Sequence, residues 1–139
     1  MLSAIDISTS GLVAQRMRMI QISNNIANIK STRNERGESV PYQPKTVVFQ
    51  ADESIGSNGA AGVKVSSVQT MPVEPIWRND PSHPDAVKEG PHKGQVAMPN
   101  IDMMSEFTNA LEAARSYEAN LGAMDITKQM EQQTLRILA

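Results

Sequence analysis

The fold is decided by the last stretch of the chain, residues 99–139, which read PNIDMMSEFTNALEAARSYEANLGAMDITKQMEQQTLRILA. Apolar and small side chains recur in this stretch with a spacing of seven, which predicts one long amphipathic helix with a coiled-coil-like seam. Such a stripe is too large to remain in water, so the helix must pack against partners. One line of the seam holds Phe107, Ala114, Leu121 and Leu135, and the other holds Met103, Ala110, Tyr117, Met124 and Leu138.

The seam is interrupted at Lys128 and Glu131, near the end of the stretch. Asn100 or Asp102 is the expected N-cap of the helix. Because a helix that is apolar on two sides needs two sets of neighbours, the pattern indicates assembly rather than chemistry. The second apolar line lies on another side of the helix and holds Ala123, Ile126, Met130 and Ile137.

The N-terminal part of the chain predicts a second long helix, over residues 3–29. Gly11 lies inside it, where glycine costs roughly 1 kcal/mol relative to alanine and indicates close packing. Asn24, Asn25 and Asn28 crowd its end, either as a fraying cap or as side chains that fix register by hydrogen bonds to neighbouring helices. Its apolar face is formed by Ile5, Leu12, Met19 and Ile26, flanked by Val13, Ile20 and Ala27.

The middle of the chain predicts a loop and a small β module. Residues 30–44 are polar and carry an excess of positive charge, which favours a solvated loop over a nucleic-acid arm. Strands are expected at 46–50, 63–69 with a slip before Val68, and 73–78, with a flexible connection containing the Asn58-Gly59 turn. Residues 79–98 are expected to form an extended loop. The small module should lean on the helices or on neighbouring subunits.

Composition excludes several classes of function. There is no cysteine, and the 13 basic and 15 acidic residues leave a net charge of −2, so we expect no nucleic-acid partner. No apolar run is long enough for membrane insertion, and the start of the chain lacks the pattern of a cleaved signal peptide. His83 and His92 lie near three carboxylates but without metal-ligand spacing. We therefore expect no enzyme activity, cofactor or metal.

Several motifs resemble those of a known family. The segments DISTSGL at 6–12 and SNNIAN at 23–28, followed by Thr32, are similar to the N-terminal motif of bacterial flagellar rod and hook axial proteins. The segments DPSHPDA at 80–86, PNI at 99–101 and RSYEAN at 115–120 resemble the proximal rod proteins within that family. These motifs occur in the same order over nearly the whole chain.

The resemblance implies an α+β fold in which the long N- and C-terminal helices pair as a coiled-coil-like unit beside a small, mostly β middle module. It divides the chain into an N-terminal axial helix at 1–30, a loop plus β module at 31–98 and a C-terminal axial helix at 99–139. It also implies a tubular helical array that transmits torque, has a bore through which exported subunits pass, and spans the periplasm as part of the basal-body rod. It further implies that the subunits are exported unfolded by the flagellar type III export apparatus, without a cleaved signal peptide.

The expected partners are copies of this chain, other rod proteins and the export apparatus. Two alternatives remain, namely another rod or axial subunit and a soluble helical adaptor or export chaperone. We expect the intramolecular helix pair to end near Lys128 and Glu131, where contacts with other subunits take over. The predicted assembly interface consists of Ile5, Leu12, Met19, Asn24, Asn25, Ile26, Asn28, Phe107, Leu111, Ala114, Tyr117, Glu118, Asn120, Leu121, Met124, Ile126, Met130, Leu135 and Leu138.

Overall fold

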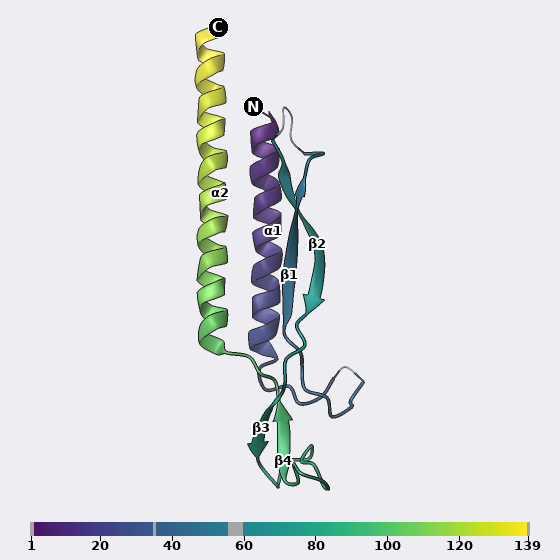
Figure 1. The fold of residues 1–139 in the computed structure, drawn as a ribbon. Helices are drawn as coiled ribbons and strands as arrows, with labels where there is room; N and C mark the ends of the chain where they lie inside the picture. The colour runs from purple at the N-terminus through teal and green to yellow at the C-terminus, as the bar shows by residue number, and fades with distance from the viewer. Residues whose placement is uncertain (1, 35, 56–59, 139) are drawn as a thin grey trace.

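The computed structural model describes residues 2–34, 36–55 and 60–138, and the Asn58-Gly59 turn expected from the sequence lies outside these ranges. The chain folds into two long helices and two β-hairpins (Figure 1). Together they give the expected α+β fold. In chain order the elements are α1 Leu2–Ala27, β1 Lys45–Asp52, β2 Gly62–Thr70, β3 Ile76–Asn79, β4 Gln95–Met98 and α2 Met103–Leu138.

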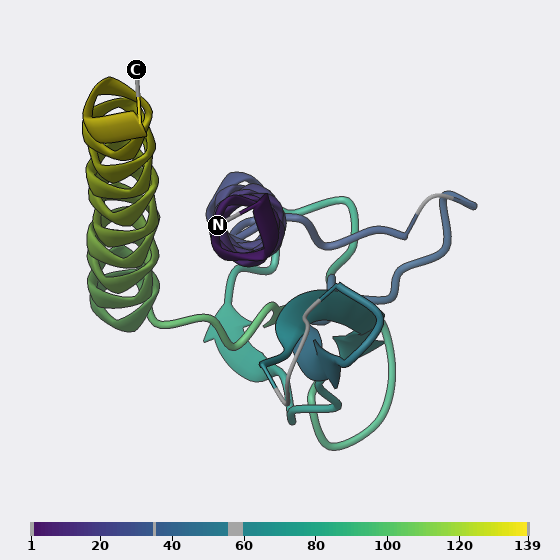
Figure 2. The same ribbon diagram turned by 90° about the horizontal axis from the view of Figure 1, so that it is seen from above.

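Helix α1 forms the middle of three layers. Helix α2 packs along one side of it, and the hairpin β1–β2 packs along another (Figures 1 and 2). The two helices run antiparallel and pair as the sequence predicted. Among the described elements α2 contacts only α1, so most of the circumference of this helix has no neighbour within the chain.

The start of α2 is set by Asp102. Its carboxylate accepts hydrogen bonds from the backbone N–H groups of Met104 and Ser105, at 3.3 and 3.1 Å, which satisfies donors that a helix N-terminus leaves free. Asp102 is therefore the N-cap, and the helix begins four residues later than the Pro99 boundary expected from periodicity. The Ser105 hydroxyl also donates a hydrogen bond to this carboxylate, and this bond, followed by those from the Ser105 and Met104 N–H groups, holds the pKa of Asp102 below its ordinary value.

The hairpin β1–β2 contains the irregularity that the sequence suggested. Val48 pairs with Ser67 and Phe49 pairs with Val65, so Ser66 is the extra residue of a β-bulge. The slip in the alternation before Val68 is thus confirmed. The hairpin leans on α1, where the Ser10 hydroxyl accepts a hydrogen bond of 2.9 Å from the Val63 N–H.

The segment expected as one extended loop, residues 79–98, contains a strand. Residues 95–98 form β4, which pairs antiparallel with β3, and Val96 at its centre is 1% exposed. The loop prediction was wrong here because four residues between Gly94 and Pro99 carry little local signal, whereas pairing with a distant strand stabilises them. Strand β3 also begins later than expected, at Ile76, because Pro75 has no N–H group to donate to the ladder.

Candidate assembly interface

Small and polar residues form the contact between the two helices. Gly11 of α1 lies against the side chain of Asn120, and a Cβ added at Gly11 would approach the Asn120 Nδ2 to 2.8 Å. About two turns away on α2, Ala113 is completely buried. Next to Ala113, Glu112 forms an ion pair of 3.1 Å with the guanidinium of Arg18, which lies about two turns from Gly11 on α1. The lack of bulky side chains at Gly11 and Ala113 therefore allows a close approach of the two helices.

This contact differs by one residue from the seam that we expected. On α2 the positions facing α1 are 106, 113 and 120, rather than 107, 114 and 121. On α1 they are 11, 18 and 25, rather than 12, 19 and 26. At Gly11 and Ala113 the physical reason is size, because glycine and alanine allow a close approach that phenylalanine and leucine would prevent. The other four positions carry polar side chains. The other expected line on α2 does approach α1, since Ala110, Tyr117 and Met124 are half-buried.

The large apolar side chains of α2 consequently point into solvent. Met104, Phe107, Leu111 and Leu121 are 72%, 48%, 62% and 44% exposed, and at 100° per residue they share one side of the helix. A second exposed stripe on another side holds Ile126, Met130 and Ile137. Soluble monomers rarely expose contiguous apolar surface on this scale, so two free faces of α2 are candidates for contact with other chains.

The predicted interface residues fall into three classes of burial. Asn25 alone is fully buried. The half-buried residues are Ile5, Leu12, Met19, Ile26, Asn28, Ala114, Tyr117, Asn120 and Met124. The exposed residues are Asn24, Phe107, Leu111, Glu118, Leu121, Ile126, Met130 and Leu135, while the side chain of Leu138 lies outside what the structure describes.

Helix α2 extends beyond its partner. Facing residues on the two helices have numbers that sum to 130 or 131, as in the pairs Gly11 with Asn120 and Arg18 with Glu112. By this register Leu2 lies level with residue 129, so residues 130–138 project past the start of α1 by about 13 Å at 1.5 Å per residue. Figure 1 shows α2 extending beyond the start of α1. The intramolecular pair thus ends close to Lys128 and Glu131, where the sequence pattern breaks.

Asn25 joins three elements at the other end of the helix pair. Its Nδ2 donates to the Lys45 carbonyl at 2.9 Å and to the Glu106 carboxylate at 3.4 Å. Its Oδ1 accepts from the Lys45 N–H at 2.9 Å and from the Tyr42 hydroxyl at 3.1 Å. All four hydrogen-bonding positions of this buried amide are therefore used, which ties the end of α1 to β1 and to the first turn of α2.

The two explanations offered for the asparagines both apply, to different residues. Asn25 fixes register between elements, as described above. Asn28 instead makes a local cap, in which its Nδ2 donates to the Asn24 carbonyl at 2.9 Å and its Oδ1 accepts from the Ser31 hydroxyl at 2.9 Å. Asn24 itself is exposed. The partners of Asn25 were not predicted, although Tyr42 was the one aromatic residue in a polar loop.

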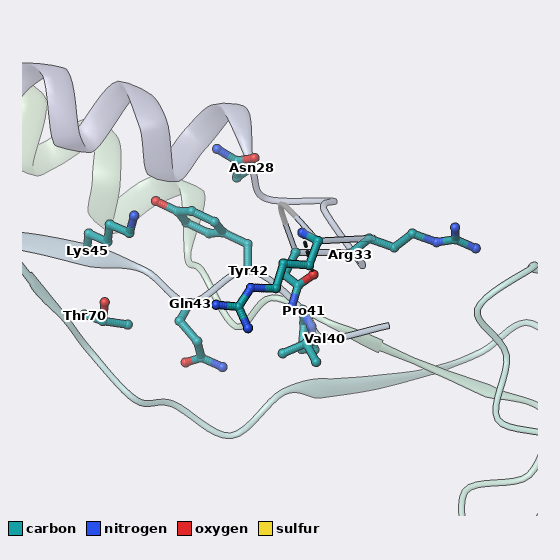
Figure 3. Close-up of a pocket in the computed structure, with 10 residues that line it drawn as sticks. Asn28, Arg33, Val40, Pro41, Tyr42, Gln43, Lys45 and Thr70 are labelled. Atoms are coloured by element: carbon teal, nitrogen blue, oxygen red, sulfur yellow. Dashed lines mark hydrogen bonds between the residues drawn. The ribbon is translucent and has the colours of Figure 1, made fainter. Parts of the chain in front are cut away.

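The Tyr42 ring borders a pocket of about 430 Å³ beside the end of α1 (Figure 3). Burial, followed by the nearby negative charge of Glu106, raises the pKa of the Tyr42 hydroxyl. Among the residues that the structure describes, none that lines this pocket is a carboxylate or a histidine. The lining residues are Asn28, Arg33, Asn34, Arg36, Val40, Pro41, Tyr42, Gln43, Lys45 and Thr70.

The described part of the chain holds neither a cluster of metal ligands nor a membrane-spanning helix. No group of three or more metal-ligating side chains lies within reach of one ion in the part of the chain that the structure describes. Within the same residues, neither helix is long and apolar enough to cross a membrane. The salient features of the molecule are thus its unpartnered helix faces.

Comparison with known proteins places the chain in a family. A model described as the C-terminal part of the flagellar basal body rod proteins FlgE, FlgF and FlgG matches residues 92–137, which cover β4 and α2. The flagellar basal-body rod protein FlgC of Bacillus subtilis is 38% identical, over 96% of this chain and 95% of that protein. The FlgC proteins of Salmonella typhimurium and Borreliella burgdorferi are 36% and 33% identical, over 99% and 98% of this chain and 97% and 96% of their own lengths. The chain therefore belongs to the FlgC family of flagellar basal-body rod proteins.

Proposed function

We propose that this chain is a structural subunit of the bacterial flagellar basal-body rod, and that it assembles through its terminal helices with copies of itself and with other rod proteins. The observation that carries the proposal is the row of large apolar side chains on the free faces of α2. Burial of this surface between subunits yields roughly 25 cal/mol per Å² of apolar area removed from water. Family membership supports the rod as the place of assembly.

The proposal assigns different partners to different surfaces. The stripe with Phe107, Leu111 and Leu121 contacts one neighbouring subunit, and the stripe with Ile126 and Met130 contacts another. The exposed pair Val13 and Ile20 on α1, spaced by seven, adds a third contact line. Copies related by a repeated rotation and rise would use the same faces in every subunit and produce a helical tube.

The division into axial and outer parts belongs to the same proposal. Segments 1–30 and 99–139 form the wall of the tube, and segment 31–98 lies outside it. The tube transmits torque, and its bore passes subunits that are exported later. The chain itself reaches the periplasm-spanning rod through the flagellar type III export apparatus, as the family resemblance implies, and acts without a catalytic step.

The proposal is tested by placing a charge on the exposed stripe. Leu121→Asp should block incorporation into basal bodies and abolish motility, because a carboxylate would be buried between subunits. The isolated chain should keep its fold, since Leu121 is 44% exposed in it. Gln50→Asp, at an exposed position of β1 in the segment proposed to lie outside the wall, is a control for added charge alone. Swimming cells that carry Leu121→Asp as their only copy would contradict the proposal, as would finding the unaltered chain in the cytoplasm and not in purified basal bodies.

A further inference from the structure

The hairpin β3–β4 is separate from the other elements. Among the described residues, neither of its strands contacts α1, α2, β1 or β2. Figure 1 places it beyond the end of α1, on the side away from the N-terminus. The chain enters the hairpin through residues 71–75 and leaves it through residues 99–102. Two short connections leave the hairpin free to pivot unless another contact restrains it.

Such a contact is made by Asp85, in the loop between β3 and β4. The Thr32 hydroxyl donates to Asp85 Oδ2 at 2.8 Å, and the Arg33 Nε donates to Asp85 Oδ1 at 2.8 Å. The Arg33 Nη2 lies 2.7 Å from the same oxygen. The Asp85 side chain is only 6% exposed, whereas that of Arg33 is 53% exposed. A buried carboxylate on the hairpin is thus held by two side chains of the segment that directly follows α1.

The same loop contains a second aspartate with a different role. The carboxylate of Asp80 accepts hydrogen bonds from Ser82 at 2.9 Å and from Arg78 at 3.2 Å, so both of its partners belong to the hairpin itself. Asp80 shapes the hairpin, while Asp85 connects the hairpin to the helical unit. The two residues therefore provide a matched pair for experiment.

We propose that Asp85 is a positioning residue, and that its contacts with Thr32 and Arg33 fix the angle at which the β3–β4 hairpin is held against the helical unit. Ile76 and Trp77 on the hairpin are 52% and 38% exposed, so this angle determines where their apolar surface points. The consequence for contacts between subunits rests on the proposed function. The restraint itself is a property of the single chain and is tested there.

The sequence suits a direct distance measurement. Trp77 is the only tryptophan and there is no cysteine, so Trp77 serves as energy-transfer donor to one acceptor attached at Gln50→Cys, an exposed position of β1. In this background Asp85→Ala should broaden the donor–acceptor distance distribution roughly twofold, because the hairpin is then free to pivot. Asp80→Ala should leave the width unchanged. Asp85→Asn, which keeps an oxygen acceptor for Thr32, should lie between Asp85→Ala and the unaltered chain.

A further variant excludes simple misfolding of the hairpin. Arg33→Ala removes the restraint from the other side without changing any residue of the hairpin, and should broaden the distribution as Asp85→Ala does. Equal broadening by Asp80→Ala and Asp85→Ala, or an unchanged width in both Asp85→Ala and Arg33→Ala, would overturn the proposal. Neither result would affect the proposed assembly role, which is tested separately by whether the Leu121→Asp variant fails to enter basal bodies.

Discussion

Replacement of Gly11 by alanine tests whether the close contact between α1 and α2 is as the structure describes. The new Cβ would lie 2.8 Å from the Asn120 Nδ2, 3.0 Å from its Cγ and 3.1 Å from its Oδ1. Ordinary contacts of a Cβ begin near 3.4 Å, so the Asn120 Nδ2 must move away from the new Cβ by about 0.6 Å. Asn120 cannot move freely, because its Nδ2 donates to the Ser116 carbonyl at 3.0 Å.

The sign of the effect follows from three magnitudes. Alanine in place of a glycine inside a helix gains about 1 kcal/mol of helix propensity. Overpacking of a close contact costs about 1–3 kcal/mol, and loss of the Asn120 hydrogen bond costs about 1 kcal/mol more. Gly11→Ala should therefore lower the free energy of unfolding by about 1–3 kcal/mol. In the double variant with Asn120→Ala, Gly11→Ala should no longer carry this penalty. A double-mutant cycle of the two substitutions should therefore give a coupling energy of about 1–3 kcal/mol.

Denaturant unfolding followed by far-UV circular dichroism measures these differences, at a protein concentration below the onset of self-association. Gly122 of α2 provides the matched control, because a Cβ added there meets no atom within 4 Å. Gly122→Ala should raise the free energy of unfolding by about 1 kcal/mol. If Gly11→Ala stabilised the chain as Gly122→Ala does, with no coupling to Asn120, the helix contact described above would be refuted.

Three further predictions concern hydrogen bonds and protonation. Asn25→Ala should cost about 2–3 kcal/mol in denaturant unfolding, because it removes the partner of four hydrogen-bonding groups on Tyr42, Lys45 and Glu106. Exposed Asn24→Ala should change stability by less than about 0.5 kcal/mol, and equal effects of the two variants would contradict the role of Asn25. Burial raises the pKa of Tyr42, so the folded chain retains its proton longer than the unfolded chain, and stability should fall as pH rises above about 10. The phenolate absorbance of a variant with the other tyrosine replaced by phenylalanine measures that shift, and titration at the ordinary value would contradict it. The hydrogen bond from Arg33, followed by that from Thr32, lowers the pKa of Asp85. The contribution of Asp85 to the free energy of unfolding should therefore be present above about pH 3.9 and lost as pH falls through the lowered pKa. The free energy of unfolding of Asp85→Asn should lack this pH dependence, and the same dependence on pH as in the unaltered chain would refute the prediction.

The fold could be predicted to a large extent from the sequence because its helices are long. A spacing of seven that persists through Phe107, Ala114 and Leu121 identifies a helix whichever face is buried. Strand β4 could not be found in the same way, since Val96 has neighbours that carry no β pattern and its partner lies in β3. Local signals identify long elements, whereas short strands depend on contacts that are distant in sequence.

The candidate interface was predicted in part. Periodicity located the two apolar lines of α2, but it could not tell which would face α1, because pairing depends on side-chain size as well as polarity. Gly11 was recognised as a close-packing position, yet its contact with Asn120 requires the register of the two helices. The link between Asp85 and Thr32 could not be foreseen either, since 53 residues separate them.

The one-residue offset in the helix pair has a consequence for assembly. If Phe107 and Leu121 had faced α1, the isolated chain would bury its largest apolar groups and would have little left with which to bind neighbours. Because the facing positions are instead occupied by residues such as Gly11 and Ala113, the intramolecular contact is close but buries little apolar area. The stability of α2 should then depend on the concentration of its partners, as expected for a subunit whose core is completed between chains.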